Sequence, residues 1–178
     1  LTISKSSLTK KNLTEAVETT AEITAMVFMI LLGSSIFSLV FRGFGGDDII
    51  TGIFSELPGG AFGAVLVVMI IIFLLGFILD FIQITLVVVP IVGPALLMLG
   101  VDPIWLGIMI AINLQTSFLT PPFGFALFYL RGVAPDTLAT KDIYRGVIPF
   151  ILIQLGVLIA LAIFPELVTA LPQAVYGS

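Results

Sequence analysis

Five long apolar runs, each free of Asp, Glu, Lys and Arg, dominate the hydropathy pattern of the chain. They cover residues 23–41, 61–79, 81–101, 104–130 and 146–165. Each is close to the roughly 20 residues that a helix needs to cross about 30 Å of hydrocarbon. The pattern therefore predicts an all-α integral membrane protein.

Two shorter segments are amphipathic. In residues 8–22, apolar side chains such as Leu13 and Val17 recur at helical spacing among charged ones, which predicts a surface helix leading into the membrane. The segment 46–58 starts with two acids suited to a helix amino terminus and is bounded by Gly and Pro residues. We expect this second segment to lie at the membrane interface.

Together these patterns predict a sequence of elements along the chain. They are an amphipathic helix within 1–22, a transmembrane helix 23–43, an interfacial arm helix 46–58, a re-entrant hairpin 61–99, a broken transmembrane helix 103–131, a final transmembrane helix 143–165 and a tail 166–178.

Cationic side chains are distributed unequally between the loops. Six of them share one face of an alternating topology, and only Arg42 falls on the other: Lys5, Lys10, Lys11, Arg131, Lys141 and Arg145. By the positive-inside rule the face with six cations is cytoplasmic. The segment before residue 22 is then expected in the cytoplasm and the carboxyl terminus in the periplasm.

This topology requires residues 61–101 to leave one side and return to it, either as a re-entrant hairpin or as two full spans that turn near Asp80. Three features favour the hairpin: breaks in both arms, polar side chains just past the turn, and no cation beside the turn. The residues concerned are Gly76, Pro90 and Pro94 in the arms, and Gln83 and Thr85 past the turn.

Asp80 is the only charged residue between 61 and 101. A carboxylate at membrane depth costs several kcal/mol unless a partner satisfies it. One interpretation is an ion or proton site, and the other is a carboxylate that caps the second helix of the hairpin. The two are compatible, because a capped helix end at membrane depth can itself belong to a site.

A polar cluster and two adjacent prolines interrupt the run 104–130. Pro121 and Pro122 remove two backbone donors and disfavour helix at Thr120, so the helix is expected to unwind there and to restart at Gly124. The freed carbonyls and the hydroxyls of this segment would form an oxygen-rich cage suited to sodium, and the new helix start would favour an anion. The alternative is an ordinary proline kink. The polar members of the cluster are Asn113, Gln115, Thr116, Ser117 and Thr120.

Composition removes most enzyme classes. Hydrophobic residues make up 59% of the 178 residues and charged residues 10%, and the chain has neither Cys nor His. Thiolate, imidazole and zinc chemistry are therefore absent from this stretch, and one intramembrane Asp falls short of the two that aspartyl chemistry needs. Because residue 1 is Leu, we expect the chain to be one piece of a larger polypeptide.

Two smaller features are explained by structural roles. The small residues 33–35 of the first run indicate close helix packing more than ligation. Trp105 and Tyr144 near the ends of spans are expected to be interfacial anchors.

Three groups of residues, in order, resemble the large membrane subunit of tripartite ATP-independent periplasmic (TRAP) transporters, in its carboxyl-terminal half. They are residues 75–80 (LGFILD), residues 89–94 (VPIVGP) with 99–104 (LGVDPI), and residues 113–114 (NL) with 119–128 (LTPPFGFALF). The resemblance implies one inverted repeat of an elevator-type sodium symporter in a bacterial inner membrane. It also implies four partners: a small TRAP membrane subunit, a periplasmic substrate-binding protein, the amino-terminal half of the same subunit and an organic anion. No nucleic acid is expected.

By the same resemblance, Na⁺ would be held by Gly76, Ser117, Thr120 and Phe123. Substrate or hairpin-tip contacts would come from polar residues nearby: Asp80, Gln83, Thr85, Asn113 and Gln115. Ser117 stands where many relatives carry Gly, and Gln83 follows Asp80 where a proline-containing turn is more usual, so the coordination stays open. The same residues would also suit a dicarboxylate symporter without a binding protein, and a third alternative is a membrane assembly subunit without a solute path.

Overall fold

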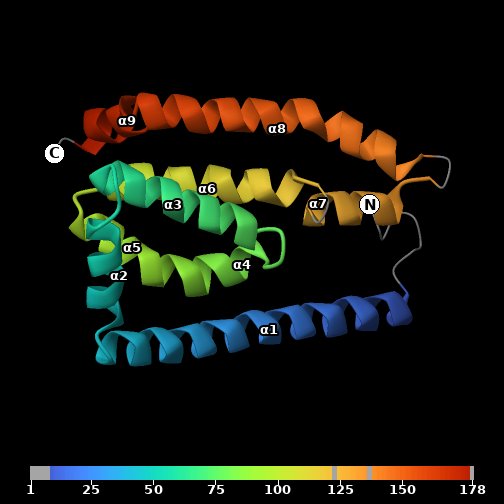
Figure 1. Cartoon of the computed structure of the whole chain (residues 1–178). Helices are drawn as coiled ribbons and strands as arrows, with labels where there is room; N and C mark the ends of the chain where they lie inside the picture. The colour runs from blue at the N-terminus through green and yellow to red at the C-terminus, as the bar shows by residue number, and fades with distance from the viewer. Residues whose placement is uncertain (1–8, 122–123, 136–137, 177–178) are drawn as a thin grey trace.

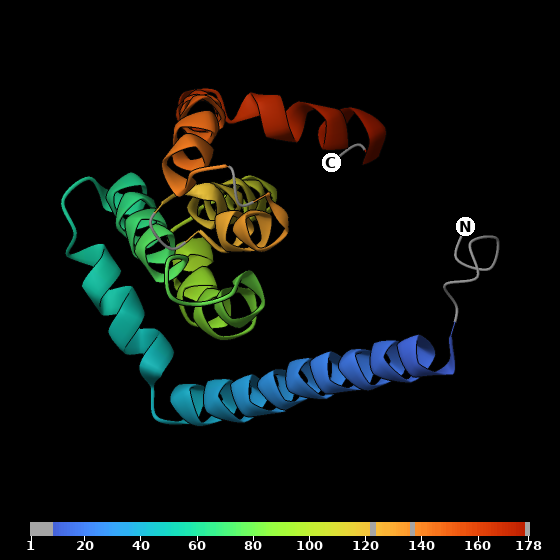
Figure 2. The same ribbon diagram turned by 90° about the vertical axis from the view of Figure 1, so that its right-hand side faces the viewer.

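The computed structural model describes residues 9–121, 124–135 and 138–176, which form helices joined by short turns. Most of the helices run along a common direction, whereas α2 (Gly46–Ser55) crosses one end of the molecule (Figure 1) and α9 (Glu166–Tyr176) turns away from the helix before it (Figure 2). The all-helical prediction is therefore confirmed for the described residues.

A single long helix, α1 (Lys10–Gly43), begins the described chain. Thr9 caps it by accepting a hydrogen bond from the Asn12 backbone N–H at 3.2 Å. The amphipathic segment and the first transmembrane run thus form one helix instead of two, because no proline separates them. Figure 2 shows α1 standing apart from the other helices over much of its length.

The short helix α2 (Gly46–Ser55) turns the chain by 114° into α3 (Gly60–Leu75). Gly59 and Gly60, at the start of α3, both have a positive φ. Residues with a Cβ rarely adopt this conformation. α2 also packs against α5, so it braces the end of the hairpin.

The return arm of the hairpin begins with α4 (Phe81–Gln83), continues as the π-helix η1 (Ile84–Val88) and ends as α5 (Val89–Met98). The π-helix ends two residues before Pro90, whose missing N–H leaves the Leu86 carbonyl without its usual helical donor. α3 packs against η1 and α5, so the two arms lie side by side. The turn between the arms lies part-way along α1 and α8, short of their far ends (Figure 1).

α6 (Pro103–Leu119) and α7 (Phe125–Val133) follow the hairpin, with a break in the helix between them. The long α8 (Thr140–Ile163) then runs back along α6. The expected tail contains a further helix, α9 (Glu166–Tyr176), which follows Pro165 and has an acid in its first turn.

The core lies between α3, α5 and α6. Its largest fully buried side chains are Ile72, Ile84, Leu96, Val68, Thr116 and Ser117, so two hydroxyl groups lie among aliphatic ones. A smaller cluster of Leu127, Ile143 and Val147 joins α7 to α8.

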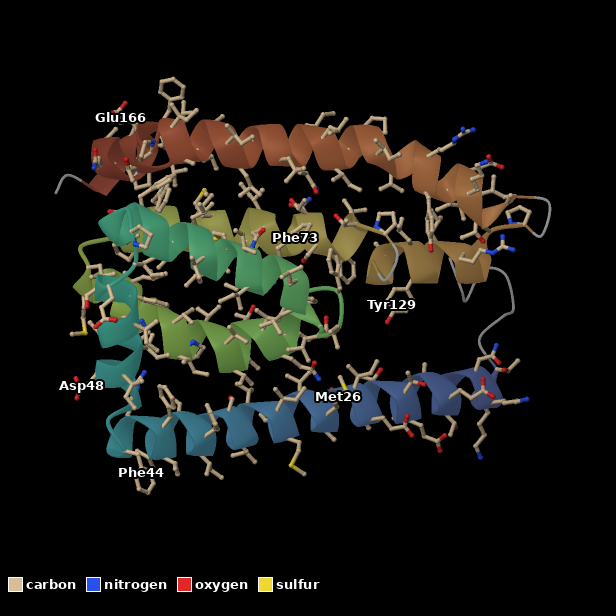
Figure 3. The ribbon with its side chains drawn as sticks, in the orientation of Figure 1. Met26, Phe44, Asp48, Phe73, Tyr129 and Glu166 are labelled. Carbon is tan, nitrogen blue, oxygen red and sulfur yellow. The ribbon has the colours of Figure 1, made fainter. Side chains whose placement is uncertain are left out.

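Most other apolar side chains are exposed, as for Phe44, which points away from the rest of the molecule (Figure 3). Within the described residues, three helical stretches are long and apolar enough to cross a membrane: α1, residues 81–98 and α8. The bent pair α2 and α3 makes a fourth if it counts as one span. Lipid is therefore the surrounding that this surface suits.

Candidate functional site

The hairpin turn and the end of α6 meet at Gly76 and Ser117. Gly76 is the last residue of the α3 helical conformation and is buried. A Cβ added to Gly76 would lie 2.7 Å from the Ser117 Cβ and would also collide with Ser117 Oγ. The approach is therefore closer than any residue with a side chain would allow. The sequence prediction that these two residues share a site is consistent with this contact.

Three hydroxyl groups near the end of α6 each donate a proton to a carbonyl of their own helix. Thr116 Oγ1 donates to the Ile112 carbonyl at 2.7 Å, Ser117 Oγ donates to the Leu114 carbonyl at 2.9 Å, and Thr120 Oγ1 donates to the Thr116 carbonyl at 2.7 Å. A hydroxyl oxygen has two lone pairs besides its single donor. Since the proton is used within the helix, the oxygen atoms remain able to accept a cation.

The helix breaks at Thr120, which has extended backbone angles (φ −84°, ψ 125°). Across the break, the Gly124 N–H donates to the Thr120 carbonyl at 3.1 Å. A Cβ on Gly124 would lie 2.8 Å from the Phe118 carbonyl oxygen and 3.0 Å from that of Thr120. Gly124 therefore lets the start of α7 pack directly on main-chain oxygens.

Two residues of the expected site, Pro122 and Phe123, lie outside the described residues. Pro121 is described and forms part of the turn. Pro121 and Pro122 lack the N–H groups that a continuous helix would offer to the carbonyls of Ser117 and Phe118. This loss explains why α6 ends where it does.

The oxygen atoms at this junction are neutral. They come from hydroxyl groups and main-chain carbonyls, and no group of three His, Cys, Asp or Glu side chains that could hold a metal ion occurs in the part of the chain that the structure describes. Hard oxygen donors suit a hard cation, whereas thiolate and imidazole sites suit zinc or copper. The donor set at the junction thus fits an alkali cation.

Asp80 and Gln83 act together at the start of the return arm. Asp80 is the N-cap of α4, and Gln83 Oε1 accepts a hydrogen bond from the Asp80 backbone N–H at 3.3 Å, which completes a capping box. The capping interpretation of Asp80 therefore has a geometric basis, and the pair fixes the first turn of the return arm.

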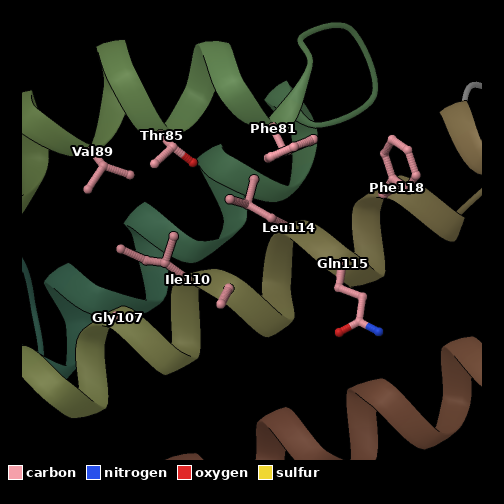
Figure 4. A pocket seen from close by; sticks show the side chains of 9 residues that line it. Phe81, Thr85, Val89, Gly107, Ile110, Leu114, Gln115 and Phe118 are labelled. Atoms are coloured by element: carbon pink, nitrogen blue, oxygen red, sulfur yellow. The ribbon is translucent and has the colours of Figure 1, made fainter.

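A groove of about 510 Å³ separates the return arm from α6 (Figure 4). Apolar side chains line most of it, and Thr85 and Gln115 are its polar members. The Gln115 amide points away from Thr85 and from the return arm (Figure 4). These two candidate residues therefore share one groove, although their polar groups do not meet.

Asn113 lies deeper, in the contact between α6 and α3. Its side chain is 4% exposed, and Nδ2 donates to the Met69 carbonyl at 2.8 Å. The structure thus separates Asn113 from the hairpin tip and gives it a role in joining two helices. The sequence could not predict this contact, because the acceptor is the main-chain oxygen of Met69 and not its side chain.

Trp105 differs from the expected interfacial anchor. It is 8% exposed, and its Nε1 donates to the Leu161 carbonyl at 2.7 Å, which ties α6 to the end of α8. The acceptor is again a main-chain oxygen. Asp102, at the start of α6, accepts the Trp105 backbone N–H at 2.8 Å and so fixes the first turn that carries this indole.

A broken helix beside a hairpin tip is the arrangement expected from the sequence, and comparison with known proteins decides its family. The family model described as "Tripartite ATP-independent periplasmic transporter, DctM component" matches residues 1–167. The chain belongs to this family. Because the family consists of transporter components, the expectation that the chain is no enzyme is confirmed.

Three relatives illustrate the range of the family. The chain is 26% identical to a sialic acid TRAP transporter large permease protein of Vibrio cholerae, over 99% of the chain and 41% of the relative. It is 31% identical to the ectoine/5-hydroxyectoine protein of Ruegeria pomeroyi over 86% of the chain and 35% of the relative. It is 30% identical to the C4-dicarboxylate protein of Pseudomonas aeruginosa, over 85% of the chain and 35% of the relative. The chain thus spans well under half the length of these relatives.

Proposed function

We propose that this chain is the carboxyl-terminal half of a sodium-coupled TRAP transporter that imports a small organic acid. The periplasmic binding protein would deliver the acid, and a small membrane subunit would complete the membrane part. The amino-terminal half of the same subunit would supply a second hairpin and a second broken helix. The elevator mechanism is part of this proposal.

The contact between Gly76 and Ser117 carries the proposal. It brings the tip of a hairpin to the point where α6 loses its helical hydrogen bonds, so a chain reversal and a helix break meet inside an apolar protein. The hydroxyl protons of Ser117 and Thr120 are already used by carbonyls of their own helix, so only the oxygens are left for a ligand. Ser117 Oγ is buried and Thr120 Oγ1 is half-buried, and both retain lone pairs that a sodium ion can use.

Two further observations support an organic acid as the substrate. The amino terminus of α7, a helix of nine residues, faces the break and favours negative charge there. The related permeases are named for sialic acid and C4-dicarboxylates, among others. A carboxylate is the group that the two observations have in common.

The test is uptake into proteoliposomes that contain the complete transporter with its binding protein. Replacing Ser117 and Thr120 together by Ala should raise the sodium concentration for half-maximal uptake at least tenfold. Thr24→Ala is the matched control, because Thr24 Oγ1 makes the same hydrogen bond to a carbonyl four residues earlier at 2.7 Å on exposed α1. Unchanged sodium dependence in the double variant would reject the site.

Two further measurements separate the alternatives. Uptake that persists without the binding protein would favour a symporter of the dicarboxylate type. A membrane assembly subunit would show no sodium protection against thermal unfolding, whereas the proposed site requires that sodium raise the Tm of the wild type and not of the double variant.

A further inference from the structure

A second groove runs along one face of α1. Its volume is about 380 Å³, and it lies between α1 and the return arm of the hairpin. Three serines and an arginine line it on α1, and two residues line it on the hairpin: Ser34, Ser35, Ser38, Arg42, Leu86 and Pro90. Neither the family resemblance nor the proposed sodium site accounts for this groove.

Small side chains keep the groove open. Ser34 Oγ and Ser35 Oγ both donate to the Leu31 carbonyl, at 3.0 and 2.7 Å, so their hydroxyl groups are satisfied without a ligand. The lining begins at Leu31 and ends at Arg42, which at 1.5 Å per residue gives a length of about 16 Å along the helix axis. This length is that of an extended acyl chain of more than ten carbons.

Arg42 stands at one end of this groove, one residue before α1 ends at Gly43. Its side chain is 53% exposed, and Nε lies 3.7 Å from Asp47 Oδ2 on α2. This loose contact engages one of the guanidinium nitrogens and leaves the two terminal amino groups for another acceptor. A guanidinium presents a fork that fits the oxygens of a phosphate.

We infer that the groove holds a membrane phospholipid, with its phosphodiester on Arg42 and one acyl chain along the serines of α1. Charge complementarity supports this occupant, since Arg42 is the basic residue of the groove and a phosphodiester is an anion. Position supports it too, because Arg42 lies at the end of a helix that is apolar enough to span a bilayer. A lipid wedged there would contact both α1 and the hairpin, so it could affect their relative position during transport.

The experiment uses the complete, purified transporter, stripped of lipid and then titrated with dioleoylphosphatidylglycerol or dioleoylphosphatidylethanolamine under native mass spectrometry. Arg42→Ala should weaken binding of the most tightly held lipid about tenfold for both lipids, since both carry the phosphodiester. Ser38→Leu should also weaken lipid binding, because the larger side chain fills the groove. Gly33→Leu is its matched control, because a Cβ on Gly33 meets nothing within 4 Å and Gly33 does not line the groove. Arg145→Ala, an exposed cation on α8, controls for charge.

Four results would overturn the inference. The first is equal lipid retention in Arg42→Ala and wild type. The second is a loss of lipid binding in Asp47→Ala as large as that in Arg42→Ala, since Asp47→Ala removes the ion pair and keeps the guanidinium. The third is a photo-crosslink from benzoylphenylalanine at position 39, where Leu39 lines the groove, to protein and not to lipid. Such a crosslink would show that another part of the transporter fills the groove. Displacement of the lipid by inorganic phosphate at millimolar concentration would likewise mean that Arg42 binds a free anion.

Discussion

Gly76 on the hairpin and Ser117 on α6 touch so closely that a methyl group on Gly76 would come within 2.7 Å of the Ser117 Cβ. Gly76 itself has ordinary helical angles (φ −63°, ψ −10°). Space, and not backbone conformation, is therefore the reason that this position needs Gly. The contact joins the two elements that the proposed sodium site requires.

Gly76→Ala should consequently separate the hairpin tip from α6. Overpacking of this kind costs about 1–3 kcal/mol, and sodium-dependent uptake should fall with it. Removing the opposing side chain as well, in Gly76→Ala with Ser117→Gly, should recover thermal stability. Gly93→Ala is the control within the same hairpin, since a Cβ there would have its nearest neighbour at an ordinary 3.9 Å. Equal effects of Gly76→Ala and Gly93→Ala on the Tm would contradict the steric explanation.

Gly124→Ala should disturb the other side of the junction. The added methyl would press on the carbonyl oxygens of Phe118 and Thr120, 2.8 and 3.0 Å away, which cannot move without reshaping the break. We expect the apparent affinity for sodium to fall several-fold while the binding protein still docks, as measured by uptake at graded sodium concentrations. Gly132→Ala on α7, where a Cβ meets nothing within 4 Å, should leave the sodium dependence unchanged.

Asn113 should prove to be a stability residue. Asn113→Leu removes the hydrogen bond to the Met69 carbonyl and should lower the free energy of unfolding by about 1 kcal/mol. Asn113→Asp places a charge in the same buried contact and should lower the free energy of unfolding by several kcal/mol. Thermal unfolding in detergent measures the difference. Gln115→Leu, which replaces an amide two residues on, should leave the Tm within about a degree of wild type because the Gln115 side chain is exposed. A larger fall in Tm for Asn113→Leu than for Asn113→Asp would show that side-chain shape and not polarity governs this contact.

Sequence predicts this fold well where breaks and polarity have local causes. The prolines and glycines near residues 58–60 and 120–124 predict the bend before α3 and the interruption after α6, because they remove donors or permit positive φ. At the amino end, the change in amphipathicity led us to expect 1–22 and 23–43 as separate elements, whereas α1 is continuous from Lys10. Amphipathicity changes there without any residue that ends a helix.

The candidate site was predictable only in part, for a physical reason. Ser117, Thr120 and Gly124 stand out as polar or small residues within an apolar run. The partners of Asn113 and Trp105 do not, because they are the main-chain carbonyls of Met69 and Leu161, which every residue type possesses. The close approach of Gly76 to Ser117 depends on tertiary packing over 41 residues, which no local pattern encodes.

Asp80 offers the sharpest separation of structure from function. As the N-cap of α4 it is expected to tolerate Asp80→Asn, because Asn caps as well as Asp, whereas Asp80→Ala should cost about 1 kcal/mol. The same two substitutions at Asp102 calibrate the result, since Asp102 Oδ1 caps α6 with a 2.8 Å bond from the Trp105 N–H. Thermal stability and sodium-driven uptake should both survive in Asp80→Asn, and both should decline together in Asp80→Ala. If Asp80→Asn instead keeps its Tm and loses uptake while Asp102→Asn keeps both, the negative charge itself takes part in transport, and the carboxylate belongs to an ion or proton site in addition to its cap.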